Sequence, residues 1–295
     1  MRDRLPPILW IAFGAMLWGT DTVFRRPLTG RLEPVQIVLY EHLILALLVL
    51  PVLFRHAAFL KKLPAQTWLL LIGIGWIGSA LATVLFTDAI RSGSPTTAVL
   101  LQKTQPLFAL IFARIIMHER WPRSFPAVVL VAMAGTYLVA FGDGNLLTPL
   151  HSVELVPALL AIGAAVGWAL ATVWGTMASA QLPFELMTAL RITCALPLLL
   201  VLAIAGHPAQ LPNSHDIVSL FWMALIPGFA GLMLYYRGLQ NTTASRATIA
   251  ELAFPITASL LNWSFLAVPT SWLQIGGFAV VWTAILSLTP TRNGL

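Results

Sequence analysis

Residues 18–24 of this chain read Trp-Gly-Thr-Asp-Thr-Val-Phe, and residues 168–174 read Trp-Ala-Leu-Ala-Thr-Val-Trp, 150 positions later. The tryptophan, the second threonine and the valine coincide. Further on, Pro106 matches Pro255 at an offset of 149. A register shared by tryptophan and proline over such distances indicates that the second half of the chain repeats the first.

The composition predicts that lipid covers most of the surface. Hydrophobic residues make up 58% of the 295 positions and charged residues only 9%, whereas soluble domains carry about 25% charged residues. The net charge of +6 would suggest nucleic acid in a soluble protein. Here the basic residues lie mostly between apolar segments, so we expect them to orient the chain in a bilayer and we expect no nucleic-acid partner.

The apolar segments predict an all-α integral membrane protein. A bilayer core of about 30 Å requires about 20 apolar residues in a helix. Ten segments meet this requirement: 8–24, 35–54, 68–90, 96–117, 125–141, 155–177, 184–205, 217–236, 247–266 and 272–288. Glycines 73, 75 and 78 fit a G-x-G-x-x-G pattern inside one of these segments, where they predict close helix packing and not a phosphate site.

Each half of the chain holds five segments, with residues 1–145 as the first repeat and residues 146–295 as the second. Because five is odd, the second repeat must enter the membrane upside down relative to the first. Inverted repeats of this kind build transporters that alternate access to one central cavity. The sequence therefore predicts ten transmembrane helices in two inverted halves around such a cavity.

The arginines and lysines predict that both termini lie in the cytoplasm. With that orientation, the outer side carries Arg25, Arg26, Arg31 and Arg91. The cytoplasmic side carries a larger basic set, as the positive-inside rule requires: Arg2, Arg4, Arg55, Lys61, Lys62, Arg114, Arg120, Arg123, Arg237, Arg246 and Arg292.

Charged and strongly polar side chains inside the apolar segments are candidate substrate ligands. A charge inside lipid costs about 2.5 to 3.5 kcal/mol on insertion scales, so it usually faces a cavity or a partner. We expect a carboxylate of the solute to meet Lys103 or Arg191, and an ammonium group to meet Asp21, Glu41 or Glu251. Three acids against two bases therefore favour a zwitterionic solute. The full set is Asp21, Glu41, His42, Gln102, Lys103, Arg191 and Glu251.

Two of these polar residues occupy equivalent positions in the two halves of the repeat. Gln102 corresponds to Glu251, and each lies one helical turn before a proline, Pro106 or Pro255. A proline removes a helical hydrogen bond and lets the helix bend, so we expect a hinge beside each polar group. The alternative for the charges is mutual pairing that only stabilises the bundle, and Glu41 with Lys103 is the candidate pair.

Intramembrane aromatic residues form a further group of candidates. Trp18, Trp168, Tyr235 and Trp263 lie within expected helices, away from the headgroup region. They could stack on an apolar part of the solute or contact a cation. The alternative is that they pack in the core or face lipid.

Three groups of residues carry a resemblance to a known family. They are the pair Trp18-Gly19, the stretch 92–119 with Gln105-Pro106-Leu107-Phe108-Ala109 before His118-Glu119, and a second copy from 244 to 256. Together they resemble the drug/metabolite transporter superfamily in its EamA-type branch. Two departures, Ala169 in place of the glycine and Val268 at the position equivalent to Glu119, mean that the halves need not be functionally equal.

The resemblance implies a multi-pass transporter of the bacterial inner membrane that carries a small molecule and has no cofactor. The chain is most similar to bacterial amino acid exporters, particularly the aromatic amino acid exporter, which implies export of amino acids and related metabolites. A drug or organic-cation exporter is the alternative within the superfamily. An intramembrane enzyme would need a nucleophile with a base, or clustered metal ligands, on facing helices; the sequence has neither spacing, so we expect no catalytic or metal site.

Overall fold

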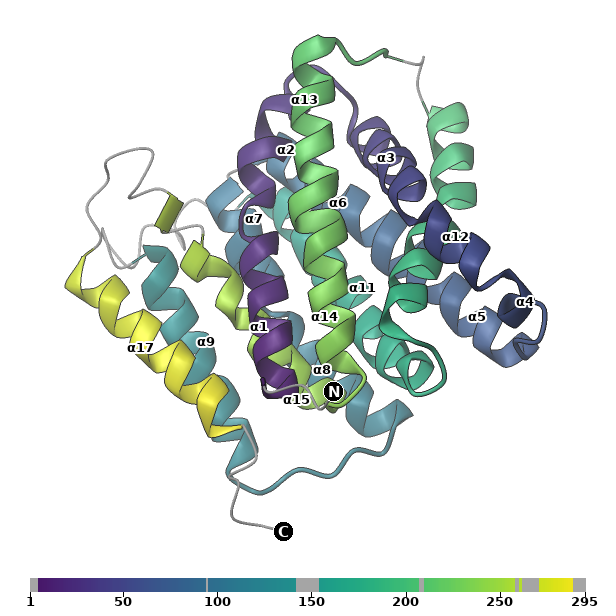
Figure 1. Cartoon of the computed structure of the whole chain (residues 1–295). Helices are drawn as coiled ribbons and strands as arrows, with labels where there is room; N and C mark the ends of the chain where they lie inside the picture. The colour runs from purple at the N-terminus through teal and green to yellow at the C-terminus, as the bar shows by residue number, and fades with distance from the viewer. Residues whose placement is uncertain are drawn as a thin grey trace.

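The computed structural model describes residues 5–93, 95–141, 154–206, 210–257, 260–261 and 271–288, and within these ranges the chain forms helices and no strands (Figure 1). Two segments are π-helical, Ile74–Leu81 and Ala224–Gly231, and Glu251–Ala253 is a 3-10 turn. The α-helices are α1 (Pro7–Trp18), α2 (Asp21–Thr29), α3 (Pro34–Arg55), α4 (Ala57–Leu60), α5 (Ala65–Gly73), α6 (Ala82–Ser92), α7 (Pro95–Gln102), α8 (Gln105–Ile116), α9 (Phe125–Phe141), α11 (Leu155–Ser179), α12 (Phe184–Gly206), α13 (Ser214–Met223), α14 (Leu232–Leu239), α15 (Ala244–Ala250) and α17 (Trp272–Ser287).

Within the described residues, seven continuous helical stretches are long and apolar enough to cross a membrane, and two shorter apolar helices, Phe125–Val139 and Trp272–Ser287, accompany them. These coincide with the expected segments other than 247–266, which lies partly outside the described residues and whose described part begins in α15. The expected boundary at residue 145, and Trp263 and Val268, also lie outside the described residues. Large apolar side chains such as Phe54 and Ile204 remain exposed on the bundle, as a lipid-facing surface requires.

The first membrane-spanning stretch is longer than the sequence predicts, and it is bent. It runs from Pro7 to Thr29, with α1 ending at Trp18 and α2 beginning at Asp21. Arg25 therefore belongs to a helix inside the bundle, and its assignment to the outer loop was wrong. A carboxylate at position i−4, that of Asp21, neutralises the guanidinium and makes this position tolerable.

The two π-helical segments occupy equivalent places in the two halves, 150 positions apart. Ile74–Leu81 packs against α11 and α12, while Ala224–Gly231 packs against α1 and α3. Each π-helical segment thus packs against two helices of the other half of the chain. π-Helical turns are rare and often occur at functional sites, and here both adjoin the bundle centre.

Helix breaks precede both prolines that we expected to be hinges. The first break separates α7 from α8 at residues 103–104, and Pro106 lies in the first turn of α8, where a proline costs no hydrogen bond. The second is the 3-10 turn Glu251–Ala253, directly before the turn that contains Pro255. Each polar residue emphasised by the repeat, Gln102 or Glu251, therefore lies at the edge of a break.

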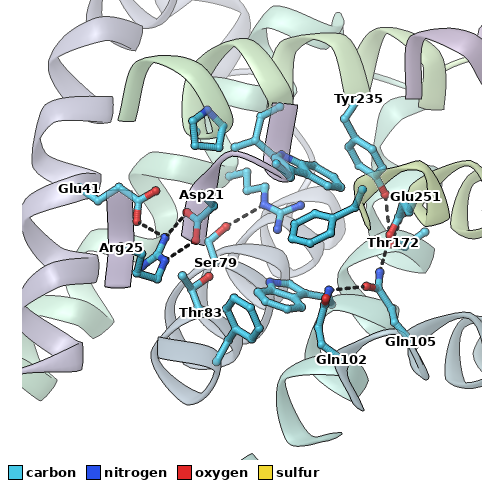
Figure 2. A pocket seen from close by; sticks show the side chains of 18 of the residues that line it. Asp21, Arg25, Glu41, Ser79, Thr83, Gln102, Gln105, Thr172, Tyr235 and Glu251 are labelled. Carbon is cyan, nitrogen blue, oxygen red and sulfur yellow. Dashed lines mark hydrogen bonds and ion pairs between the residues drawn. The ribbon is translucent and has the colours of Figure 1, made fainter. Parts of the chain in front are cut away.

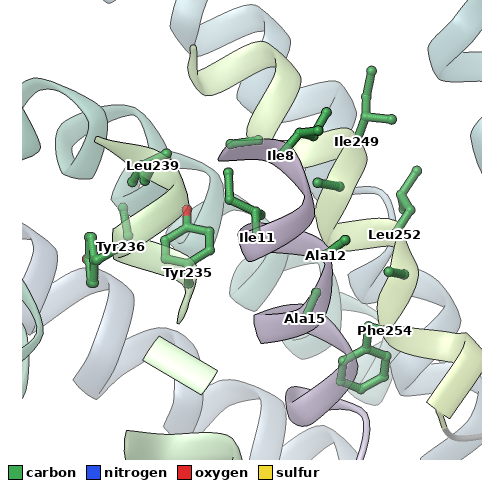
Figure 3. Packing of buried hydrophobic residues seen from close by; sticks show 14 of the residues in the cluster. Ile8, Ile11, Ala12, Ala15, Tyr235, Tyr236, Leu239, Ile249, Leu252 and Phe254 are labelled. Carbon is green, nitrogen blue, oxygen red and sulfur yellow. The ribbon is translucent and has the colours of Figure 1, made fainter. Parts of the chain in front are cut away.

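Small residues allow close approach of helices at other places in the bundle. A Cβ atom on Gly14 of α1 would lie 2.7 Å from the carbonyl oxygen of Gly231, and one on Gly167 of α11 would lie 2.9 Å from the Cβ of Ala82. Backbones can therefore pack closely where α1 meets the π-helical segment Ala224–Gly231 and where α11 meets α6. A buried apolar cluster fills the end of the bundle at which α1 begins, as Figure 3 shows for Ile8 and Ile11 beside Leu239 and Ile249.

Candidate functional site

A polar cavity lies at the centre of the bundle, where the bent and broken helices meet (Figure 2). It contains about 930 Å³ of empty space, including space open to solvent. Ten of the candidate side chains line it: Trp18, Asp21, Glu41, His42, Gln102, Lys103, Trp168, Arg191, Tyr235 and Glu251. The structure also brings residues there that the sequence did not single out as ligands, among them Arg25, Ser79, Thr83, Phe86, Gln105, Thr172 and Phe254.

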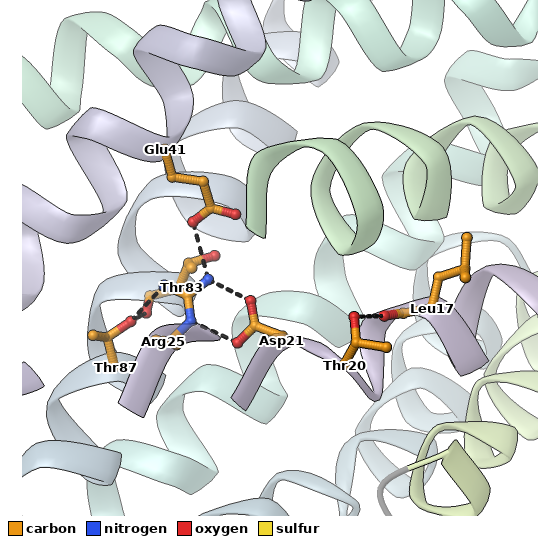
Figure 4. Close-up of polar contacts among 7 residues, drawn as sticks. All are labelled: Leu17, Thr20, Asp21, Arg25, Glu41, Thr83 and Thr87. Carbon is orange, nitrogen blue, oxygen red and sulfur yellow. Dashed lines mark hydrogen bonds and ion pairs between the residues drawn. The ribbon is translucent and has the colours of Figure 1, made fainter. Parts of the chain in front are cut away.

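One side of the cavity is an ion-pair cluster centred on Arg25 (Figure 4). The guanidinium donates from Nε and Nη2 to Asp21 at 2.6 and 2.7 Å, and from Nη2 to Glu41 at 2.9 Å. Its Nη1 atom donates to the hydroxyl of Thr87 at 3.1 Å. Arg25 is only 2% exposed, so this cluster is a closed unit in which two acids share one cation. The spacing of Asp21 and Arg25, four residues apart, is the sequence signal that could have identified it.

The expected pairing of Glu41 with Lys103 was wrong, because Arg25 takes the Glu41 carboxylate. Lys103 instead lies over the ring of Phe254, with Nζ 3.8 Å from the ring centroid. A cation–π contact of this kind compensates part of the cost of burying an ammonium group. Lys103 forms no ion pair with any residue that the structure describes, and its side chain lines the cavity.

Glu251 lies on the side opposite the Arg25 cluster, within a neutral hydrogen-bond network (Figure 2). Its carboxylate accepts from Gln105 Nε2 at 2.5 Å and from the hydroxyl of Thr172 at 3.2 Å. The phenol of Tyr235 donates to Thr172 at 3.0 Å, and Gln102 donates to Gln105 at 3.4 Å. Among the described residues, this buried acid has hydrogen-bond donors but no ion-pair partner.

Arg191 of α12 is the third cation of the cavity and is 8% exposed. Its Nε atom donates to the hydroxyl of Ser79 at 2.7 Å, and Nη1 donates to the phenol of Tyr236 at 3.2 Å. Ser79 belongs to the π-helical segment, so this segment holds the guanidinium at the cavity wall. No described carboxylate pairs with Arg191, and part of its donor capacity is unused.

Aromatic rings complete the walls. Trp18 and Tyr235 lie with their centroids 5.0 Å apart, and Trp168 meets Phe86 edge to face at 5.3 Å. Trp18 and Trp168 are the tryptophans that mark the repeat, so the repeat places one indole from each half at the same cavity.

Adding Arg25 corrects the charge count from the sequence to three acids and three bases. Asp21 and Glu41 are committed to Arg25, which leaves Lys103, Arg191 and Glu251 without ion-pair partners among the described residues. The cavity can therefore offer ammonium and guanidinium donors, one carboxylate and aromatic faces to a solute. The described part of the chain contains no group of three or more His, Cys, Asp or Glu residues placed to hold a metal ion.

Comparison with known protein families agrees with this geometry. Residues 5–141 and 155–289 match the EamA-like transporter family. The chain belongs to this family. It is a multi-pass membrane transporter of the drug/metabolite transporter superfamily, and the two matched stretches fall on either side of the gap in the described residues.

Individual relatives match most or nearly all of the chain. The riboflavin transporter ImpX of Fusobacterium nucleatum subsp. nucleatum is 28% identical over 298 residues, which cover 98% of this chain and 99% of the relative. The uncharacterized transporter YwfM of Bacillus subtilis is 23% identical over 213 residues, which cover 71% of this chain and 70% of the relative. A crystal structure at 19% identity has the same fold, with a TM-score of 0.73 over 95% of this chain and 94% of that one.

Proposed function

We propose that this EamA-like transporter carries a planar aromatic metabolite of the riboflavin type by alternating access. The observation that carries the proposal is that one cavity combines aromatic walls with cationic hydrogen-bond donors that have no described ion-pair partner. Trp18 with Tyr235 and Trp168 with Phe86 offer ring faces, and Lys103 and Arg191 offer hydrogen bonds. A flavin has a flat ring system and carbonyl groups along one edge, so it needs both kinds of contact.

The lining of the cavity supports a solute of this class, because charged and aromatic side chains face the same space. The similarity to a riboflavin transporter along almost the full length of both chains favours the same class.

An aromatic amino acid is the second candidate. It is supported by the three charged groups that have no described ion-pair partner: the solute carboxylate would bind Lys103 or Arg191 and its ammonium group would bind Glu251. Export of such a solute follows its concentration gradient unless an ion is coupled to transport. The cavity is less suited to binding an organic cation, because Asp21 and Glu41 already form ion pairs with Arg25.

We further propose ten transmembrane helices in two inverted repeats, residues 1–145 and 146–295, in a bacterial inner membrane with both termini in the cytoplasm. The exchange of partners between the two π-helical segments supports the repeat. So does the correspondence of the two helix breaks, one before Pro106 and the other before Pro255.

Transport assays in proteoliposomes test the substrate. We expect the purified protein to accelerate entry of riboflavin over protein-free liposomes, with saturation and with competition by unlabelled riboflavin. Flux of phenylalanine or tryptophan without riboflavin flux would establish the amino acid candidate instead. Flux of quaternary ammonium dyes alone would contradict both. In each case the recovered solute should be chemically unchanged, whereas conversion would indicate an enzyme.

A further inference from the structure

Glu119 makes a contact between the two matched stretches of the chain that the transport cavity does not use. Its Oε1 atom accepts from the backbone N–H of Ala244 at 2.9 Å. Its Oε2 atom accepts from the backbone N–H and the hydroxyl of Ser245, at 3.3 and 2.5 Å. One carboxylate thus receives three hydrogen bonds from residues 125 and 126 positions further along the chain.

The contact caps the first turn of α15. Ala244 and Ser245 are the first residues of that helix, whose N–H groups have no partners within it. A negative charge is also favourable at this end of a helix. Both residues are buried, at 0% and 2% exposed, and Glu119 is half-buried, so these hydrogen bonds are partly shielded from water.

The segment that carries Glu119 is held in an unusual conformation. His118 has a φ angle of 53°, the one positive φ among the described residues other than glycine, and such a value is uncommon for a histidine. It turns the chain after α8, and Arg114 Nη1 then donates to the carbonyl oxygen of Glu119 at 3.0 Å. A strained residue that is braced by a neighbour indicates that the position of the following side chain matters.

This contact lies at the end of the bundle where α1 begins. A Cβ atom on Gly238, near the end of α14, would touch the carbonyl oxygen of Pro7, so α15 starts beside the beginning of α1 (Figure 1). Between there and the cavity, Ile11 and Ala12 of α1 are fully buried against Leu239 and Ile249 (Figure 3). The Glu119 contact therefore joins the two halves just outside an apolar layer that lies between the beginning of α1 and the cavity.

At the opposite end the halves share a buried apolar cluster that includes Leu28 and Leu220, but the polar contacts between them are more exposed. Arg31 meets Asp216 at 3.3 Å, but the Arg31 side chain is 51% exposed. Tyr40 donates to the carbonyl oxygen of Gln210 at 2.8 Å, also on the exposed surface. Exposed ion pairs contribute little to stability, so the partly buried Glu119 contact makes the polar contacts at the two ends unequal.

We infer that Glu119 is a positioning residue of the transport cycle: by capping α15 it holds the bundle closed at the end where α1 begins, and it releases Ala244 and Ser245 when the cavity opens toward that end. This role of Glu119 does not depend on which solute the cavity carries. The equivalent position in the second half is Val268, which has no carboxylate, so this role belongs to the first half alone.

Thiol labelling of the purified protein in detergent tests this role without a substrate, so its outcome is separate from that of the proposed function. In a Cys194→Ala background, Ala12→Cys reports on the apolar layer and Thr83→Cys on the cavity. We expect Glu119→Gln to increase the labelling rate of Ala12→Cys several-fold and to decrease that of Thr83→Cys, because opening one end closes the other. Ser245→Ala should shift both rates in the same directions by less, and Glu119→Asp should restore part of the original rates.

The matched control is Glu185→Gln, which neutralises an acid near the same end of the bundle and should leave both rates unchanged. Unchanged labelling in both Glu119→Gln and Ser245→Ala would overturn the inference. So would a parallel increase at both reporters, since that is the result of general loosening and not of a shift between two states. If Glu119→Gln does not fold, the same comparison in Ser245→Ala decides.

Discussion

The side-chain amide of Gln105 donates to Glu251 across the two helix breaks, with 2.5 Å between Nε2 and Oε2. Lys103, in the first break, lies over the ring of Phe254, just beyond the second. One hydrogen bond and one cation–π contact thus join the breaks of the two halves, and all four side chains line the cavity. A solute that binds Lys103 or Glu251 competes with these contacts, so we expect its binding to change how the breaks pack.

The first prediction concerns Gln105, which orients the Glu251 carboxylate. Gln105→Leu removes the shortest hydrogen bond to a buried acid, and hydrogen bonds to charged groups contribute about 1.5–3 kcal/mol. We expect the initial rate of transport in proteoliposomes to fall about tenfold or more. In a double-mutant cycle with Glu251→Ala, the two losses should overlap, because each change removes the hydrogen bond between Gln105 and Glu251. Fully additive losses would mean that Gln105 acts independently of Glu251.

The second prediction is that Lys103→Ala and Glu251→Ala each lower transport more than they lower the thermal stability. Neither residue has a described ion-pair partner that its removal would leave as an unpaired buried charge. Their loss should therefore act mainly on the solute-bound state. Rates in proteoliposomes, compared with Tm in detergent, measure the two effects. Lys61→Ala, an exposed lysine, is the control. Normal transport in both variants, or failure of both to fold, would remove these residues from the site.

The sequence predicted the membrane class and most helices because length and hydropathy determine them. It also predicted which side chains meet at the centre, since an intramembrane charge or amide has few other places to go. Trp18 and Trp168 were found through the repeat, and both line the cavity. Gln102 and Glu251 were found in the same way.

The sequence could not predict which charged side chains pair with one another. Pairing depends on how the helices are placed relative to each other, which the sequence alone does not give. Arg25 was assigned to a loop because the apolar segment ends at residue 24, and only tertiary contact with Glu41 shows why the helix continues. The π-helical segments have no sequence signature that we recognised. Ser79, which holds Arg191, was missed for this reason.

The third prediction concerns stability. Arg25→Leu leaves Asp21 and Glu41 buried side by side without their shared cation. Removing one partner of a buried ion pair costs about 3–5 kcal/mol, so we expect a large decrease in Tm. Arg26→Leu changes the neighbouring arginine, which is exposed, and should have little effect. Adding Asp21→Asn and Glu41→Gln to Arg25→Leu should restore much of the lost stability, because no unpaired charge then remains. An unchanged Tm in Arg25→Leu would show that the cluster does not support the fold.

The fourth prediction concerns topology. Moving Arg25 from the outer loop into the bundle leaves Arg26, Arg31 and Arg91 on the proposed outer side, which strengthens the cytoplasmic excess of positive charge. In a Cys194→Ala background, Leu211→Cys, in the exposed segment before α13, should therefore react with a membrane-impermeant thiol reagent in whole cells.

Lys61→Cys, in the connection between α4 and α5, should react only after the cells are lysed. The lysed sample is the control for reactivity, and it should label both variants equally. With five spans in each repeat, the Lys61 connection follows the second span and α15 begins after the eighth. Both therefore lie on the cytoplasmic side. Labelling of Lys61→Cys from outside intact cells, with Leu211→Cys protected, would reverse the orientation. Labelling of both from outside would contradict the inverted repeat, because two connections separated by an odd number of spans cannot share one side of the membrane.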